Sequence, residues 1–324
     1  MKVLLLPGDC IGPELTRQAR RVLEHLAPDV ELEERVFGAA AIRATGTPLP
    51  DDTLEAAVTA DAVLKGPVGD PEFDAAEVRP EQGLLGLRKA LDVYANLRPA
   101  RAPGTDLLIV RELVGGLYFG AKGTRPDGTV YDTCEYHPDQ IERIARRAFT
   151  YARTRRRSLV SVDKANVMET SRLWRRVVDR LAPEYPDVTV EHMLVDNAAM
   201  QLVRAPERFD VIVTENTFGD ILSDIAAEVT GGLGLAGSAS LGDGGPGMFE
   251  PVHGSAPDIA GRGIANPTGM LRSTALLLEH GLGRPEEAAA LEAAVDEAMA
   301  TAPTQDLGGT ATTAAFGDAV LAAL

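Results

Sequence analysis

Residues 209–224 read Phe-Asp-Val-Ile-Val-Thr-Glu-Asn-Thr-Phe-Gly-Asp-Ile-Leu-Ser-Asp, and this stretch says more about the fold than any other. Its first six residues predict a strand, and apolar residues at helical spacing over 221–229 predict a helix directly after it. Asp220 and Asp224 are four apart, so they share one helix face. Two such carboxylates repel each other unless a cation lies beside them, which suits Mg²⁺ or Mn²⁺. The alternative is an ordinary helix start, where the helix dipole favours acidic residues.

Strands alternate with helices along the rest of the chain. Strands are expected at 1–6, 60–65, 107–112, 158–163, 188–195 and 210–214, and helices from Pro13 onward and at 81–91. This alternation predicts an α/β protein with a sheet covered by helices on both faces. The length of 324 residues indicates two domains.

Two glycine-rich stretches interrupt this alternation. Residues 121–140 contain few β-forming residues and are expected to be either short strands or a loop. Residues 231–247 are expected to cross from one domain to the other.

Composition excludes several classes of partner. The formal net charge of −16 argues against nucleic acid and anionic membranes. No apolar run approaches the roughly 20 residues of a membrane span. The N-terminal apolar run ends at Pro7-Gly8-Asp9, as in a first strand rather than a signal peptide. Cys10 and Cys134 are the only cysteines, which indicates the reducing cytoplasm and neither a structural disulfide nor a zinc site.

Polar clusters follow four of the expected strands. They are Arg111-Glu112, Asp163-Lys164-Ala165-Asn166, Asp196-Asn197 and Thr214-Glu215-Asn216. Ligands of open α/β sheets bind where strands end, so we expect these clusters to form one site. Asp196 is a possible third carboxylate ligand, or alternatively a helix cap.

Cations near such a site would bind an anionic substrate. Arg88, Arg98 and Arg111 suit a dicarboxylate, because each guanidinium group can hold a carboxylate through two hydrogen bonds. Lys164 is a candidate general base and Tyr118 a candidate proton donor. For each residue alone, a surface or structural role is the alternative.

A nucleotide site is suggested by an unusual loop. No GxGxxG motif follows the first strand, so a standard Rossmann site is not supported. The loop at 250–267 offers His253 to pack on adenine and Asp258 to accept ribose hydroxyls and repel the 2′-phosphate of NADP. A plain surface loop is the alternative.

Together, these segments resemble the isocitrate/isopropylmalate family of metal-dependent β-decarboxylating dehydrogenases. The matching motifs lie at 6–14, 79–85, 110–118, 161–166, 195–200, 216–224, 253–266 and 306–310. The resemblance covers nearly the whole chain. It implies the two-domain fold of that family, with helices on both faces of a mixed sheet. Residues 1–93 plus 232–324 would form the large cofactor-binding domain. Residues 94–231 would form the substrate, metal and dimerisation domain, with a possible β arm at 121–140.

The resemblance also assigns roles to single residues. Asp196, Asp220 and Asp224 would bind Mg²⁺ or Mn²⁺, and Asp220 would also contact the substrate. Arg88, Arg98 and Arg111 would hold the malate carboxylates. Lys164 would take the hydroxyl proton, and Tyr118 would protonate the enol. In this family Lys164 and Asp196 would come from the second subunit of a homodimer, so each site would be shared.

Cofactor and substrate choice follow in the same way. NAD would be held by Ile11, Glu81, His253, Gly254, Ser255, Ala256, Asp258, Ala265 and Asn266. Glu81, Leu84, Leu85 and Val167 match the isopropylmalate branch, where the leucines and the valine would receive an apolar isopropyl group. Arg111-Glu-Leu-Val-Gly-Gly also fits that branch, since isocitrate and homoisocitrate enzymes usually have Asn after the Arg-Glu pair.

The implied reaction is the NAD-dependent oxidative decarboxylation of 3-isopropylmalate to 4-methyl-2-oxopentanoate in leucine biosynthesis. The alternative is the same chemistry on a related 3-substituted malate, tartrate or homoisocitrate. Two departures from the family pattern stand out. Cys10 occupies a position that is usually Gly, and the connection 101–106 is much shorter than usual.

Overall fold

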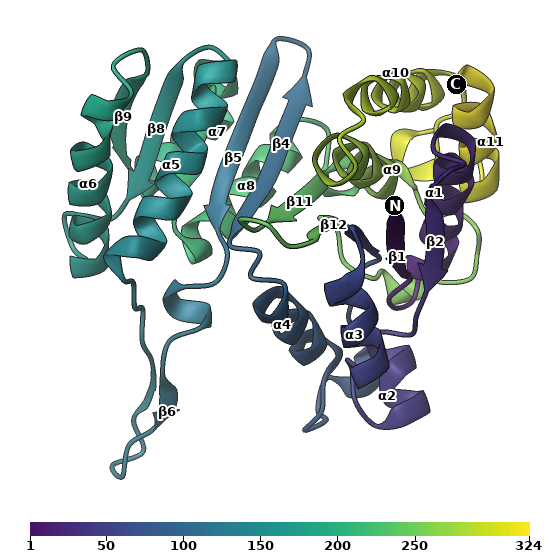
Figure 1. Cartoon of the computed structure of the whole chain (residues 1–324), viewed down its shortest axis with the longest axis horizontal. Coiled ribbons are helices and arrows are strands. Elements are labelled where there is room, and N and C mark those ends of the chain that lie inside the picture. The colour runs from purple at the N-terminus through teal and green to yellow at the C-terminus, as the bar shows by residue number, and fades with distance from the viewer. The chain divides into compact units, whose positions relative to one another are not determined.

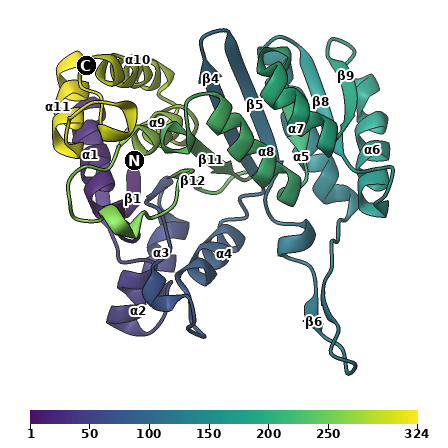
Figure 2. The ribbon, with the colours of Figure 1, turned by 180° about the vertical axis from the view of Figure 1, so that it is seen from behind.

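A computed structural model describes all 324 residues of the chain. It divides into two compact units (Figures 1 and 2). Unit 1 contains Met1–Val93 and Leu233–Leu324, and unit 2 contains Tyr94–Gly232. The chain thus leaves unit 1 once and later returns to it. None of the helices combines the length and the apolar character that a membrane span requires.

Unit 1 is built on five strands. Their order is β2 (Glu31–Glu34), β1 (Lys2–Leu6), β3 (Ala62–Lys65), β12 (Gly247–Pro251) and β11 (Gly237–Leu241). All neighbours are parallel except β11, which runs antiparallel to β12. Val3 to Leu6 are fully buried, as expected of a strand covered on both faces.

Seven α-helices belong to unit 1. They are α1 (Gly12–Leu26), α2 (Ala39–Thr45), α3 (Asp51–Thr59), α4 (Pro80–Ala90), α9 (Thr268–Leu276), α10 (Pro285–Thr301) and α11 (Thr313–Ala323). The apolar stripe predicted for α1 is buried at Leu15, Ala19, Val22 and Leu23. Helix α9 packs on β11 and β12, and both α1 and α10 pack on α9.

Unit 2 also contains five strands. Their order is β4 (Ala95–Ala102), β5 (Thr105–Glu112), β10 (Val211–Thr214), β8 (Ser158–Asp163) and β9 (Thr189–Leu194). Strands β4 and β5 are antiparallel, and the others are parallel. Helices α5 (Pro138–Thr154) and α6 (Glu169–Leu181) cover one face (Figure 1), and α7 (Val195–Arg204) and α8 (Asn216–Val229) cover the other (Figure 2). The predicted α/β class, with helices on both faces of a mixed sheet, is confirmed.

Strands with few apolar residues are where the prediction was incomplete. β4 carries Arg98, Pro99 and Arg101, which hide its strand character. The stretch 231–247 contains the expected crossing, from Gly232 of unit 2 to Leu233 of unit 1, but it also contains β11 and the start of β12, which were not predicted. Four of the five residues of β11 are small, and α9 packs closely on this strand: a Cβ at Gly237 would come within 2.6 Å of the Ser273 backbone nitrogen.

The two irregular connections also become clear. Residues 101–106 close β4 onto β5 through a turn of only two residues, Pro103 and Gly104, with Gly104 at φ +81°. Pro followed by a left-handed Gly is typical of a tight type II turn. Residues 121–140 contain a short hairpin of β6 (Lys122–Thr124) and β7 (Val130–Asp132), the first of the two expected forms (Figure 1).

Candidate active site

Arg111 is the centre of a polar cluster in unit 2. It is the penultimate residue of β5, its side chain is only 2% exposed, and its Nη1 forms a short ion pair with Asp220 of α8. Its Nε and Nη2 both donate to Oδ1 of Asn216, at 3.2 and 2.8 Å. A Cβ at Gly219 would lie 2.6 Å from Arg111 Cγ. Glycine at 219 therefore lets the arginine lie directly across the first turns of α8.

Tyr118 joins the same cluster from a short 3₁₀ turn at Gly116–Tyr118. Its hydroxyl donates to Asp220 Oδ2 at 3.0 Å, and its ring centroid lies 6.0 Å from the Arg111 guanidinium carbon. Burial, reinforced by the charge of Asp220, raises the pKa of Tyr118. The phenol therefore keeps its proton near neutral pH, as a proton donor must.

Arg98 reaches the second aspartate of α8. Its Nη1 lies 3.7 Å from Asp224 Oδ1 and donates to Ser223 Oγ at 3.4 Å, while its Nε donates to Asn96 Oδ1 at 2.8 Å. Burial raises the pKa of Asp224, although Arg98 acts in the opposite direction. Asp220 and Asp224 thus offer hard oxygen donors from one helix face, a donor set that fits Mg²⁺ or Mn²⁺.

Asp196, the third expected metal ligand, lies elsewhere within the chain. It is the second residue of α7, which begins at Val195, so the alternative role as a helix cap is wrong. Lys164 Nζ donates to its Oδ1 at 2.6 Å, and this bond lowers the pKa of Asp196. No group of three acidic, histidine or cysteine side chains in one chain could hold a metal. Within one chain the structure thus pairs Lys164 with Asp196 and places Asp220 and Asp224 on one face of α8, but it does not gather the three aspartates.

Arg88 belongs to a buried ion cluster of unit 1 that sequence reasoning missed. Its Nη2 donates to Glu250 Oε1 at 3.0 Å, and Lys65 Nζ lies 2.7 Å from Glu250 Oε2. Burial opposes ionisation of Glu250, but Lys65 and Arg88 together hold its pKa at about 2. The Nε of Arg88 is buried without a partner, so the guanidinium retains capacity for a ligand. Lys65 is a charged residue at the end of an apolar strand, and this position is the one sequence signal that could have revealed the cluster.

The residues expected near the substituent of the substrate lie on two elements. Glu81, Leu84, Leu85 and Arg88 share one face of α4, since they recur at helical spacing. Leu85 is exposed and Leu84 partly so. Val167 lies in unit 2, 65% exposed, in a turn whose backbone bonds Lys164.

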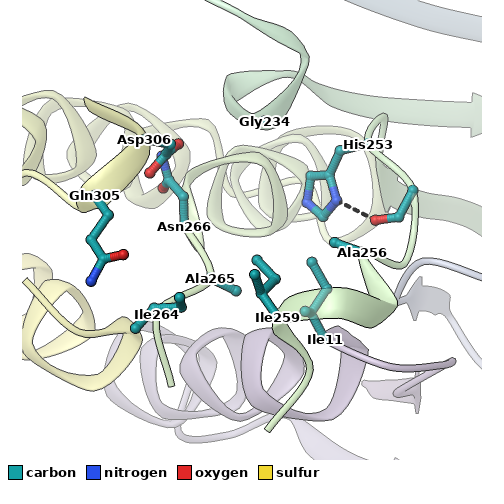
Figure 3. A pocket seen from close by; sticks show the side chains of 11 residues that line it. Ile11, Gly234, His253, Ala256, Ile259, Ile264, Ala265, Asn266, Gln305 and Asp306 are labelled. Atoms are coloured by element: carbon teal, nitrogen blue, oxygen red, sulfur yellow. Dashed lines mark hydrogen bonds between the residues drawn. The ribbon is translucent and has the colours of Figure 1, made fainter. Parts of the chain in front are cut away.

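Unit 1 also contains a cavity of about 530 Å³ (Figure 3). Six of the residues expected to bind NAD line it: Ile11, His253, Gly254, Ala256, Ala265 and Asn266. Its wall is mainly apolar with a few polar groups, as is typical of cofactor sites. Glu81, Ser255 and Asp258 do not line it, whereas Gln305 and Asp306 do and had been given no role.

The polar groups of this cavity are held in fixed orientations. His253 Nδ1 donates to the Gly254 carbonyl at 2.9 Å, which leaves Nε2 as a buried acceptor without a partner (Figure 3). Burial lowers the pKa of His253, so the ring is neutral. Asn266 donates to Asp306 Oδ2 and accepts from the Thr268 backbone, both at 2.9 Å. A neutral planar ring at an apolar wall fits a nucleotide base.

Cys10 precedes Ile11, which lines this cavity. The backbone conformation at position 10 explains why the family usually has glycine there. Its φ of +51° lies in the left-handed region that glycine adopts without strain. Here the thiol lies 3.7 Å from the Gly69 carbonyl oxygen.

A family model described as isocitrate/isopropylmalate dehydrogenase matches residues 2–320. The chain therefore belongs to the isocitrate/isopropylmalate dehydrogenase family, and the resemblance drawn from its motifs is confirmed. It is 51% identical to 3-isopropylmalate dehydrogenase from Zymomonas mobilis and 53% identical to that from Novosphingobium aromaticivorans, with all of each chain covered.

Solved structures agree on the fold. An isocitrate dehydrogenase from Methylococcus capsulatus is 39% identical with a TM-score of 0.92, covering 99% of this chain and 98% of that one. A beta-decarboxylating dehydrogenase from Thermococcus kodakarensis is 38% identical with a TM-score of 0.85, covering 99% and 95%. The expected family fold is thereby confirmed.

Proposed function

We propose that this protein catalyses the oxidative decarboxylation of 3-isopropylmalate to 4-methyl-2-oxopentanoate, a step of leucine biosynthesis, with NAD and Mg²⁺ or Mn²⁺. The observation that carries the proposal is the cluster of unit 2, in which Arg111 and Tyr118 converge on Asp220, and Arg98 lies beside Asp224. Relatives of this name match the full chain at 51% and 53% identity.

The residues of the proposed site divide the chemistry among them. Arg98 and Arg111 hold carboxylates of the substrate, and Arg88 provides a further guanidinium group. Asp196, Asp220 and Asp224 would hold the metal. The bound ion would stabilise negative charge on the substrate oxygen during loss of CO₂, and NAD would accept the hydride.

Protons are moved by two side chains. Lys164 accepts the proton of the substrate hydroxyl. Tyr118 then donates a proton to the enol product, and its raised pKa supports this acid role.

Substrate choice within the family depends on apolar contacts. Leu84 and Leu85 lie on the same face of α4 as Arg88, and Val167 lies in the Lys164 turn. Such side chains favour an isopropyl group over a carboxylate-bearing substituent, at roughly 1–3 kcal/mol per methylene. The same chemistry on a related 3-substituted malate, tartrate or homoisocitrate is the second candidate, since the similar solved structures include an isocitrate dehydrogenase.

The working enzyme is proposed to be a homodimer with shared sites. Helices α7 and α8 pack together, and they expose Met200 (61%), Val203 (65%) and Ile221 (55%). Three large apolar side chains exposed on neighbouring helices are typical of a protein interface. A second copy that covers them would bring the partner's Lys164 and Asp196 to Asp220 and Asp224. The β6–β7 hairpin is proposed to clasp the partner.

Each unit then has its own task. Unit 1 binds NAD, with His253 of the cavity packed on adenine and with Asp258, which lies between the lining residues Ala256 and Ile259 in sequence, close to the ribose. Unit 2 binds substrate and metal and forms the dimer.

A nicotinamide absorbance assay tests these assignments. Wild-type protein is given 3-isopropylmalate with NAD or NADP, and with Mg²⁺ or a chelator. We expect turnover with NAD and Mg²⁺ only. Full activity with NADP would contradict the role of Asp258, and activity in chelator would contradict that of the aspartates.

A substrate series tests the apolar pocket in the same assay. We expect malates with bulkier apolar 3-substituents to be favoured by the wild type, and Leu84→Ser to remove that preference. No advantage for such substituents in the wild type would favour the second candidate.

A further inference from the structure

Tyr136 connects two buried glutamates beside the active-site cluster. Its hydroxyl lies 3.1 Å from Glu112 Oε2 and 3.3 Å from Glu215 Oε2, and it accepts the backbone N–H of Asn216 at 3.0 Å. Both carboxyl groups are almost fully buried. The glutamates come from the end of β5 and the N-terminal cap of α8, so one hydroxyl group joins two elements of unit 2.

The hydroxyl of Tyr136 lies between two carboxylate acceptors. The tyrosine hydroxyl has a single proton and can donate it to only one carboxylate at a time. Burial raises the pKa of both Glu112 and Glu215, although hydrogen bonds from backbone N–H groups act in the opposite direction. Backbone N–H groups also hold both carboxyl groups: Val114 and Gly115 donate to Glu112, and Phe218 donates to Glu215.

Tyr136 also supports the loop that carries Tyr118. A Cβ at Gly115 would lie 2.6 Å from the Tyr136 ring, and one at Gly116 would lie 2.6 Å from its hydroxyl oxygen. Gly116 has a φ of +71°, which only glycine adopts without strain. The loop therefore lies against the tyrosine with no room for a side chain.

Asn216 links Tyr136 to Arg111 through hydrogen bonds. Its backbone N–H bonds Tyr136, its Nδ2 donates to the Gly115 carbonyl at 3.0 Å, and its Oδ1 accepts two bonds from Arg111. Asn216 is thus joined to the tyrosine through its backbone and to the glycine loop and the arginine through its side chain.

We propose that Tyr136 is a positioning residue of the active site. Held between Glu112 and Glu215, it fixes the turn that carries Tyr118 and the asparagine that orients Arg111. The inference rests on the function proposed above. Its hydroxyl bonds none of the side chains assigned to substrate, metal or NAD, so it acts through the loop and through Asn216.

The test is Tyr136→Phe, which removes only the hydroxyl. We expect kcat/KM for 3-isopropylmalate to fall roughly 10–100-fold, as for small misplacements of catalytic groups. KM for 3-isopropylmalate should rise, while KM for NAD stays unchanged because the cavity belongs to unit 1. Tyr185→Phe is the matched control, since it removes a hydroxyl from a ring stacked on Phe149, and it should match the wild type.

A rescue variant separates positioning from general damage. In Tyr136→Phe with Glu215→Gln, a neutral amide replaces one of the two buried carboxyl groups that lost the hydroxyl donor, so part of the lost kcat/KM should return. Glu215→Gln alone should keep most activity. The proposal is overturned if Tyr136→Phe equals the wild type, if both KM values rise together, or if the double variant is no better than the single one.

Fluorescence provides a readout independent of turnover. Trp174, the one tryptophan of the chain, lies 5.9 Å from Tyr136 between ring centroids. We expect its emission to shift in Tyr136→Phe and to move back toward the wild type in the double variant. Should the wild type fail to oxidise 3-isopropylmalate, the proposed function fails, while unchanged emission in all variants would refute the network itself.

Discussion

Gly219→Ala should separate the active-site geometry from the stability of α8. Alanine in a helix interior usually stabilises by about 0.5–1 kcal/mol relative to glycine. At 219, however, the added methyl would lie 2.6, 2.8 and 3.1 Å from Cγ, Cβ and Cδ of Arg111. Such contacts force the buried arginine to move, at a typical overpacking cost of about 1–3 kcal/mol.

The size of the effect on catalysis follows from the bonds that Arg111 would lose. Its two bonds to Asn216 are 3.2 and 2.8 Å long, and a hydrogen bond to a charged group contributes about 1.5–3 kcal/mol. Loss of one such bond in the transition state corresponds to roughly 10–100-fold in kcat/KM.

Steady-state kinetics and thermal unfolding measure the two effects together. Gly86→Ala in α4 is the control for stability, because its new Cβ would meet only Leu49, at an ordinary 3.4 Å. We expect Gly86→Ala to raise the Tm and Gly219→Ala to lower it and to impair use of 3-isopropylmalate. Wild-type kinetics in Gly219→Ala would refute the placement of Arg111 across α8.

Three further variants test other parts of the site. Glu250→Gln should destabilise unit 1 by about 3–5 kcal/mol in urea unfolding, because Arg88 and its buried lysine neighbour lose their counter-ion. The pKa of Glu250 is depressed to about 2, so its contribution is fully present above pH 4.5 and is lost as the pH falls toward 2, and the variant's loss of stability should shrink over that window. Asp224→Asn should weaken Mg²⁺ binding at least about tenfold in calorimetry, whereas Glu228→Gln, one turn along α8, should not. Met200→Glu should yield an inactive monomer in size-exclusion chromatography, and an active dimer would contradict the proposed interface.

Sequence patterns located the parts of the fold with strong periodicity. The apolar runs of β1, β8 and β10 were predicted because buried strands of parallel sheets are continuously apolar. β4 was missed because Arg98 and Pro99 interrupt its pattern. β11 was missed because it is made mainly of small residues. These residues allow α9 to pack closely on the strand, and the local sequence does not show that packing.

The sequence predicted the candidate site only for residues that lie at or just after the ends of strands. Arg111 lies near the end of β5, and Asp220 lies in the helix that follows β10. Both strands end at the same edge of the sheet, so the two residues could be predicted to lie close together. The roles of Asn216, Tyr136 and Glu250 depend on partners far apart in the sequence. Asp306 lay within a matching motif, yet its bond to Asn266 appears only in three dimensions.

The most direct test of the proposed shared site mixes two inactive variants. Asp196→Asn chains retain the α8 carboxylates, and Asp224→Asn chains retain Lys164 and Asp196, so a mixed dimer would contain one intact site. Random pairing makes half of the dimers mixed, so co-refolded equal amounts should regain about a quarter of wild-type activity. If mixing restores nothing while mixed dimers are present, each site lies within a single chain and the account is wrong.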